Sequence, residues 1–236
     1  MEALLRPPVE LWSTCTAFAA STLAWLAPWA QPGPGPSPDP PRLERAAPQH
    51  RRLTSGSATR SPWSPMTRRL PIGISSCLLG EMVRYDGRLK GADALIAALD
   101  EQVRWISICP EVGAGLSTPR PPMDLYQTRL GVRMRTLDGA HDVTEALEDF
   151  ARRAVARLER EGACGMIFKS RSPSCGIGDA QLHDGASETT DGLMVRAVRA
   201  ALPELPIARD EDLLTQETRD LFLAEARRYE TRRSLE

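Results

Sequence analysis

The sequence predicts an α/β fold: a three-layer α/β/α domain with a short, mostly parallel sheet, preceded by a disordered N-terminal extension. From Leu70 onward, short apolar runs typical of strands alternate with segments of helical periodicity. That alternation favours a parallel sheet with helices on both faces. Before Leu70 the composition changes, because residues 1–65 hold 12 of the 20 prolines and four of the five tryptophans.

The N-terminal part is expected to be a disordered, proline-rich leader over residues 1–66, and residues 67–236 a single α/β domain. Proline fixes φ and removes a backbone donor, so the run at 31–41 cannot form a helix or an inner strand. Residues 11–30 approach the ~20 residues of a membrane span. Polar residues, Pro28 and the acidic Glu2 and Glu10 weaken a signal or anchor interpretation. We interpret residues 1–65 as a misassigned leader, with translation starting at Met66 instead of Met1. Intact-mass measurement of the native protein would test this.

The strand and helix signals follow one another along the domain. Strands are expected at residues 71–76, 103–108, 164–168 and 205–208, a hairpin at 125–136 turning around 129–131, and helices at 92–102, 142–162, 192–201 and 210–228. The clearest helix is the second. Asp142 can cap it, Glu145 can complete a capping box, and Gly162 stops it.

The charge balance limits the classes of partner. Lys and Arg number 30 against 31 Asp and Glu, for a net charge of -1. A protein built to hold a nucleic-acid backbone would need a basic excess. The five cysteines are odd in number and sparse, which argues against a disulfide framework.

Three cysteines follow three predicted strands. Cys77 and Cys109 come directly after the first two strands, and Cys175 lies in the loop after the third. Loops that follow parallel strands emerge at the same edge of the sheet, so these residues are expected to meet there. Cys164 lies inside a strand and is expected to be a buried hydrophobe, and Cys15 belongs to the leader.

Several chemistries remain open for three converging thiols. Structural zinc usually uses closely spaced ligand pairs, and a catalytic dithiol uses a CxxC motif or a resolving partner, none of which is present. A thiolate nucleophile would need a nearby histidine, but His141 and His183 lie outside the three loops. Three thiolates can hold three corners of a cubane [4Fe–4S] cluster. The alternative is that the three side chains simply fill the interior.

Six short motifs carry a family resemblance. They are ISSCLLG at 74–80, VRYDG at 83–87, CPEV at 109–112, GLSTPRPP at 115–122, DVT at 142–144 and SPSCG at 172–176. In this order they resemble a bacterial domain family of unknown function that includes the 2-thiouracil desulfidase. The resemblance covers residues 70–214. Residues 125–140 and 177–191 match nothing in it, so we expect substrate choice to differ there.

The resemblance implies an oxygen-sensitive [4Fe–4S] cluster held by Cys77, Cys109 and Cys175. The fourth iron would take the thione sulfur of a thiolated base, and water would replace that sulfur without net redox change. The expected activity is therefore iron–sulfur-dependent desulfuration of a small thiolated base of the 2-thiouracil type, in the cytoplasm, without a membrane or nucleic-acid partner.

Roles for the matched positions can be assigned chemically. Glu111 is expected to be the general base, with a pKa raised by the cluster's charge, or else a loop ion pair with Arg120. Ser174 is expected to assist catalysis, or to form a turn around Pro173. Asp86 would read a base N–H or make an Asp-Gly turn, and Lys169 and Arg120 would hold substrate or balance charge. The expected substrate-binding residues are Ser76, Asp86, Arg120, Lys169, Ser170 and Ser172.

Two alternative functions come from other classes. One is a non-enzymatic [4Fe–4S] sensor or scaffold, which would not need Glu111 as a base. The other is cluster-dependent sulfur transfer to RNA, which would need a basic face. The arginines are instead interleaved with acids, as in residues 157–161, which favours a solvated helix face.

Overall fold

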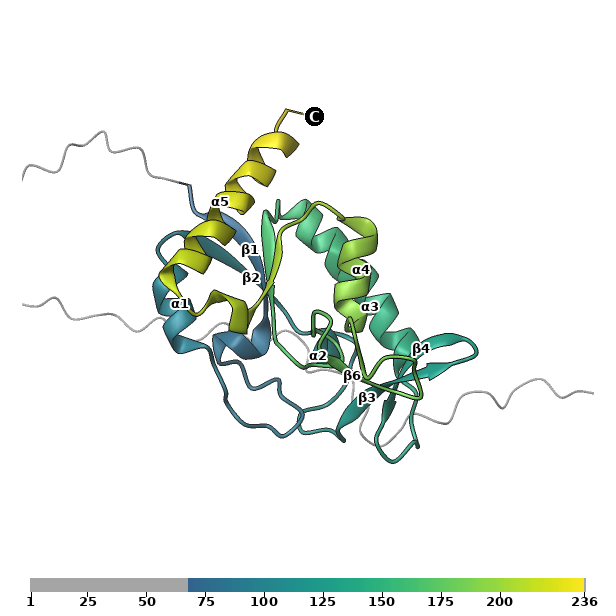
Figure 1. Ribbon diagram of the computed structural model, residues 1–236. Coiled ribbons are helices and arrows are strands. Elements are labelled where there is room, and N and C mark those ends of the chain that lie inside the picture. The colour runs from purple at the N-terminus through teal and green to yellow at the C-terminus, as the bar shows by residue number, and fades with distance from the viewer. Residues whose placement is uncertain (1–67, 236) are drawn as a thin grey trace, which may run out of the picture.

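The structure, a computed structural model, describes residues 68–235 (Figure 1). The predicted leader at 1–66, including Cys15 and Met66, lies outside the described residues. Among the residues that are described, no helix combines the length and apolar character that a membrane crossing requires.

The main sheet is wholly parallel, with strand order β2-β1-β5-β8. Its strands are β1 (Leu70–Ser75), β2 (Val103–Ile108), β5 (Gly165–Phe168) and β8 (Ile207–Arg209). All four were predicted to within two residues at each end. Their carboxyl ends point the same way, toward the bottom of Figure 1.

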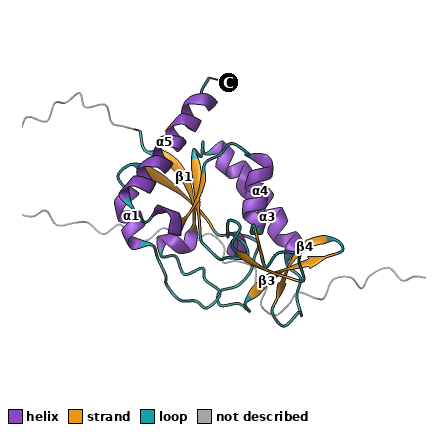
Figure 2. Cartoon of the chain, viewed as in Figure 1, coloured by secondary structure: helices purple, strands orange, loops and turns teal. Residues whose placement is uncertain are grey.

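Helices cover both faces of this sheet, which confirms the three-layer prediction (Figure 2). On one face lie α1 (Asp93–Leu99) and α5 (Gln216–Arg233), on the other α3 (Thr144–Arg160) and α4 (Leu193–Ala201). Successive residues of β1 point to opposite faces of the sheet, so they contact different pairs of helices. Ile72 and Ile74 pack under α1 and α5, whereas Gly73 faces α3, where an added Cβ would lie 2.9 Å from Leu158 Cδ2.

A second four-stranded sheet lies beside the first, with order β4-β3-β6-β7. It comprises β3 (Met123–Thr128), β4 (Gly131–Thr136), β6 (Ala180–His183) and β7 (Thr189–Thr190). The predicted hairpin is β3–β4. The strands β6 and β7 were not predicted, because they are short and fall in the unmatched segment 177–191. This sheet has its own apolar core around Leu125, Met134 and Leu182, which also contacts α3 and α4.

Two helix predictions need correction. The expected helix at 210–228 is two elements: a 3-10 helix (η2, Asp210–Leu213), and then α5, capped where Thr215 Oγ1 accepts from Thr218 N. The chain breaks because Asp210 is bonded to the loop after β5.

The predicted capping box at Asp142 and Glu145 is absent. The N-cap of α3 is Val143. Asp142 accepts hydrogen bonds from Thr144 N and from Arg133 on β4. Glu145 reaches toward Arg133, at 3.5 Å, instead of back to the helix start.

Candidate functional site

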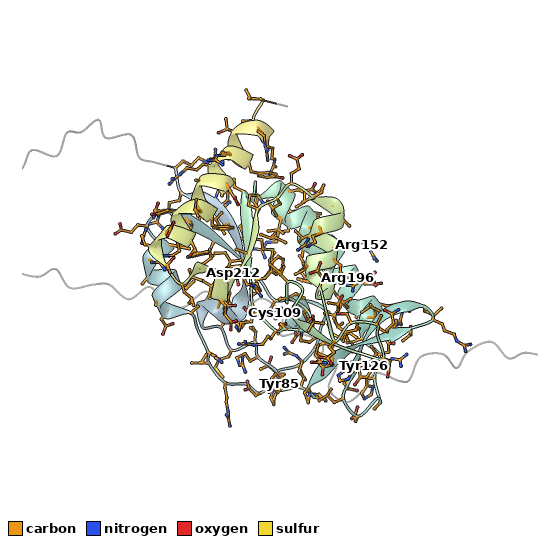
Figure 3. The ribbon with its side chains drawn as sticks, in the orientation of Figure 1. Tyr85, Cys109, Tyr126, Arg152, Arg196 and Asp212 are labelled. Atoms are coloured by element: carbon orange, nitrogen blue, oxygen red, sulfur yellow. The ribbon has the colours of Figure 1, made fainter. Side chains whose placement is uncertain are left out.

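The carboxyl edge of the main sheet carries two short helices that hold the first two cysteines. Cys77 lies in a 3-10 helix (η1, Ser76–Leu79) directly after β1, and Cys109 is the N-cap residue of α2 (Pro110–Gly113) directly after β2. Gly113 lets α2 approach α3, because a Cβ there would lie 2.1 Å from the Phe150 ring. In Figure 3, Cys109 lies at the lower end of the main sheet, with Tyr85 beneath it.

The third cysteine is held by the start of α4. Backbone N–H groups of Gly192, Leu193 and Met194 donate to Gly176 O, Pro173 O and Ser174 O at 2.8, 3.3 and 2.9 Å. These bonds satisfy donors that a helix start otherwise leaves unpaired. They fix the backbone on both sides of Cys175.

One cavity of about 370 Å³ collects most of the predicted site. Nine of the eleven predicted residues line it: Ser76, Cys77, Cys109, Glu111, Arg120, Lys169, Ser170, Ser172 and Cys175. Ser174 contacts Glu111 from behind the lining. Asp86 lies outside. It accepts from Arg84 and from Arg88 N, which is the turn alternative.

All four cysteines in the described part of the chain are free thiols. Burial and the Cys109 thiol raise the pKa of Cys77 from its ordinary 9.0 to about 11, against the opposing charges of Lys169 and Arg84. Burial also raises the pKa of Cys109 and of the fully buried Cys175. The three thiols are therefore neutral at pH 7, and a bound cation would have to displace their protons.

Within residues 68–235, no three or more His, Cys, Asp or Glu side chains form a group that could hold a metal ion. A cubane cluster makes a different demand, because each of its ligands binds a different iron atom. Three free thiols lining one cavity fit that donor set. Cys164 lies apart, buried in the core against α1 and α5, and its thiol donates to Gly162 O at 3.3 Å.

Glu111 is held on both carboxylate oxygens. Ser174 Oγ donates to Oε1 at 2.7 Å, and Arg120 Nη2 donates to Oε2. The Arg120 side chain is 2% exposed and also donates to the carbonyls of Val83 and Ser117. The ion pair offered above as the alternative role of Glu111 is thus present.

Asp210 organises the loop after β5 and was not among the predicted site residues. Its carboxylate accepts from Lys169 Nζ at 2.7 Å and from Ser170 N and Oγ at 2.8 and 2.5 Å. Burial alone would raise the pKa of Asp210, but these bonds outweigh it and lower the pKa. A signal was available, because Asp210 directly follows β8 at the same sheet edge as the cysteines.

The remaining serines support the backbone around the ligands. Ser172 Oγ accepts from Cys175 N at 3.2 Å and from Ser174 N at 3.3 Å, which is the turn role. Ser76 Oγ pairs with Ser107 Oγ on β2 at 2.7 Å. Ser75, also missed from sequence, accepts from Lys169 N and hydrogen-bonds the Cys175 thiol.

Fold and site together define an α/β protein that presents three free thiols and a fixed carboxylate to one cavity at a sheet edge. The family described as 2-thiouracil desulfurase matches residues 72–210. The chain belongs to this family, as the six motifs indicated.

Two relatives illustrate the likeness. The uncharacterized protein YbbK of Bacillus subtilis (strain 168) is 32% identical over 110 residues, which are 44% of this chain and 72% of YbbK. The solved structure of the [4Fe-4S]-dependent thiouracil desulfidase TudS is similar with a TM-score of 0.51 and 32% identity, covering 66% of this chain and 97% of that one.

Proposed function

We propose that the chain is a [4Fe–4S]-dependent desulfidase that converts the thione of a thiolated pyrimidine into the oxo base. The reaction is C=S plus H₂O giving C=O plus H₂S, and no electron changes hands. The observation that carries the proposal is the meeting of Cys77, Cys109 and Cys175 in one cavity with Glu111. Family membership and the likeness to TudS support it.

Cys77, Cys109 and Cys175 are the proposed ligands, which leaves one iron of a cubane without a protein ligand. The bound cluster would supply that iron as a Lewis acid for the thione sulfur. Lys169, fixed by Asp210, places a positive charge that lowers the pKa of Cys77. We assign Lys169 to balancing charge in the cavity. Ser75, Ser170 and Ser172 hold the loop that carries it.

Glu111 is the proposed general base. Ser174 and Arg120 fix its two oxygens, so the carboxylate cannot turn away from the cavity. A carboxylate held in place can take one proton from the attacking water while the water oxygen forms the new bond to carbon. Arg120 is a positioning residue in this scheme, because both of its terminal guanidinium nitrogens donate to protein acceptors.

The setting follows from the chemistry. Free thiols and an oxygen-sensitive cofactor suit a reducing compartment, so we place the protein in the cytoplasm. The proposed partner is a small base, since the cavity lined by η1, α2 and the loop at 169–173 has a volume of about 370 Å³, the size of a small-molecule site.

The test is anaerobic purification with iron and sulfide analysis, followed by incubation with 2-thiouracil. The expected result is a brown protein that releases one sulfide per uracil formed. A protein that carries the cluster but releases no sulfide from any thiolated base would overturn the enzyme proposal in favour of a sensor. Filter binding to tRNA with sulfide delivery to RNA would favour sulfur transfer.

A further inference from the structure

A second carboxylate residue, besides Glu111, lines the cavity. Asp124 comes from β3 of the second sheet. Strand alternation turns Leu125 into that sheet's apolar core and places Asp124 and Tyr126 on the other face. His183 of β6 lies beside Tyr126 in register, on the same face.

The Asp124 side chain is fixed by two further residues. His183 Nε2 lies 3.0 Å from Asp124 Oδ2. Because an ionised carboxylate oxygen can only accept, we assign the imidazole nitrogen as the donor. The His183 ring stacks on Tyr126 with centroids 4.8 Å apart and planes at 21°. A stacked ring that donates to one oxygen holds the carboxylate in a set orientation before any ligand arrives.

Asp124 differs in its partner from Glu111, Lys169 and Arg171 of the cavity lining. Glu111 is paired with Arg120, Lys169 with Asp210, and Arg171 with Glu211. Asp124 is instead paired with a histidine through Oδ2, which leaves Oδ1 for another donor. Its side chain is 24% exposed and the residue lines the cavity, so it is accessible to a ligand there.

A thiolated pyrimidine supplies such a donor. Its thione carbon lies between two ring nitrogens, and a base held by its sulfur at the cysteine wall presents other ring atoms away from that wall. We propose that Asp124 accepts a ring N–H of the base and thereby sets substrate specificity, with His183 as its positioning residue. This inference rests on the proposed function. Asp124 immediately precedes the segment 125–140, and His183 lies in the segment 177–191. These are the two segments that match nothing in the family resemblance.

The test compares 2-thiouracil with its N1-methyl and N3-methyl derivatives. In the parent protein, methylation of one of the two nitrogens should raise KM about 10- to 100-fold, the range for a hydrogen bond to a charged group. In Asp124→Ala, KM for 2-thiouracil should rise to the value for that methyl derivative, with kcat per cluster nearly unchanged. Asp124→Asn keeps the shape and one acceptor, so it should discriminate to an intermediate degree.

The role of His183 is tested by the ratio of the KM for the N-methyl derivative to the KM for 2-thiouracil. His183→Ala frees the carboxylate and should lower the discrimination several-fold, whereas His183→Gln keeps an N–H donor and should restore part of it. The control is Asp149→Asn, an exposed carboxylate on α3 outside the cavity lining, which should leave the ratio unchanged. Discrimination in Asp124→Ala equal to that of the parent protein would overturn the inference while leaving the proposed function intact.

A binding measurement distinguishes failure of the desulfidase proposal from failure of the role assigned to Asp124. Calorimetry of the anaerobic protein with uracil and its N-methyl derivatives needs no turnover. Affinity for uracil should fall about 10- to 100-fold in Asp124→Ala, and the N-methyl preference should disappear. If the parent protein releases no sulfide yet shows this pattern, the desulfidase proposal fails and Asp124 still reads the base. If binding in Asp124→Ala matches the parent protein, the role of Asp124 is wrong.

Discussion

Glu111 is the residue on which the proposed chemistry depends, and its two contacts give it two separable roles. Glu111→Gln keeps the shape and the contact with Ser174 but cannot accept a proton at neutral pH. Activity per intact cluster should fall ~10²–10⁴-fold, the usual contribution of a general base. The assay is anaerobic sulfide release normalised to cluster absorbance.

The same substitution also removes the negative partner of the buried Arg120, so thermal stability should fall together with activity. Ser174→Ala is the matched variant, because it removes one hydrogen bond and keeps the charge. Its activity loss should be much smaller. Unchanged normalised activity in Glu111→Gln would reduce Glu111 to a brace for Arg120.

Asp142 provides a pH-dependent contribution to stability. Burial would raise its pKa, but hydrogen bonds from Arg133, Thr144 and Arg135 outweigh that and lower the pKa from 3.8 to about 2. A depressed folded-state pKa stabilises the fold above the unfolded-state value, and the stabilisation is lost as pH falls through the folded-state value.

Denaturation at several pH values should therefore show a loss of about 2 kcal/mol between pH ~4 and ~2 that depends on Asp142. Asp142→Asn should be less stable at pH 7 by a similar amount and should lack that part of the acid slope. Glu145→Gln, a neighbour with an 84% exposed side chain, is the control. An identical acid slope in parent and Asp142→Asn would contradict the assignment.

At the scale of elements, α4 and the Cys175 loop form one unit. Gly192 lies so close to the loop that an added Cβ would be 2.5 Å from Ser174 C and 2.7 Å from Cys175 N. Backbone atoms cannot move aside as a flexible side chain can. The start of α4 thus sets the position of the third thiol.

Gly192→Ala should accordingly destabilise the protein by about 3 kcal/mol or more and reduce iron content per folded chain. Gly139→Ala is the control, because nothing lies within 4 Å of a Cβ there. Its positive φ of 70° should cost only about 1 kcal/mol, with iron content unchanged. Full iron loading of Gly192→Ala would mean that the loop holds its shape without α4.

At the scale of the whole molecule, the site exists because separate layers converge. Three parallel strands bring Cys77, Cys109 and Cys175 to one edge, and the second sheet adds Asp124 to the cavity lining. The nearest pair of these cysteines is separated by more than 30 residues in the sequence. The thiols therefore come together only in the folded domain.

Single Cys→Ser changes at positions 77, 109 or 175 should each abolish the stable cluster, against about four irons per chain in the parent protein. Cys164→Ser should retain the iron, since that thiol lies in another part of the core and serine can still donate to Gly162 O. The measurement is iron and sulfide per folded chain after anaerobic reconstitution. Iron loss on Cys164→Ser alone would reassign the ligands.

Local patterns in the sequence determined most of the main layer. The apolar runs of β1, β2 and β5 and the apolar face of α3 are visible within a window of a few residues, because burial on one face imposes a regular spacing. The rule that parallel strands end at one edge then placed the three cysteines together without any contact being known. A local turn signal at Arg129 to Gly131 likewise predicted the β3–β4 hairpin.

The tertiary structure determined which strands pair and which side chains hydrogen-bond to one another. The four residues of β6 form a strand between β7 and β3, and the pairing with β3, more than 50 positions earlier, brings His183 to Asp124. Asp210 accepts from Lys169 and Ser170 instead of lying in the expected helix. Asp142 accepts from Arg133 as well as from Thr144 N instead of forming the predicted capping box. Each of these side chains could satisfy its hydrogen bonds locally or at a distance. A short sequence window shows the local option, whereas the choice depends on which donors the folded layers bring within reach.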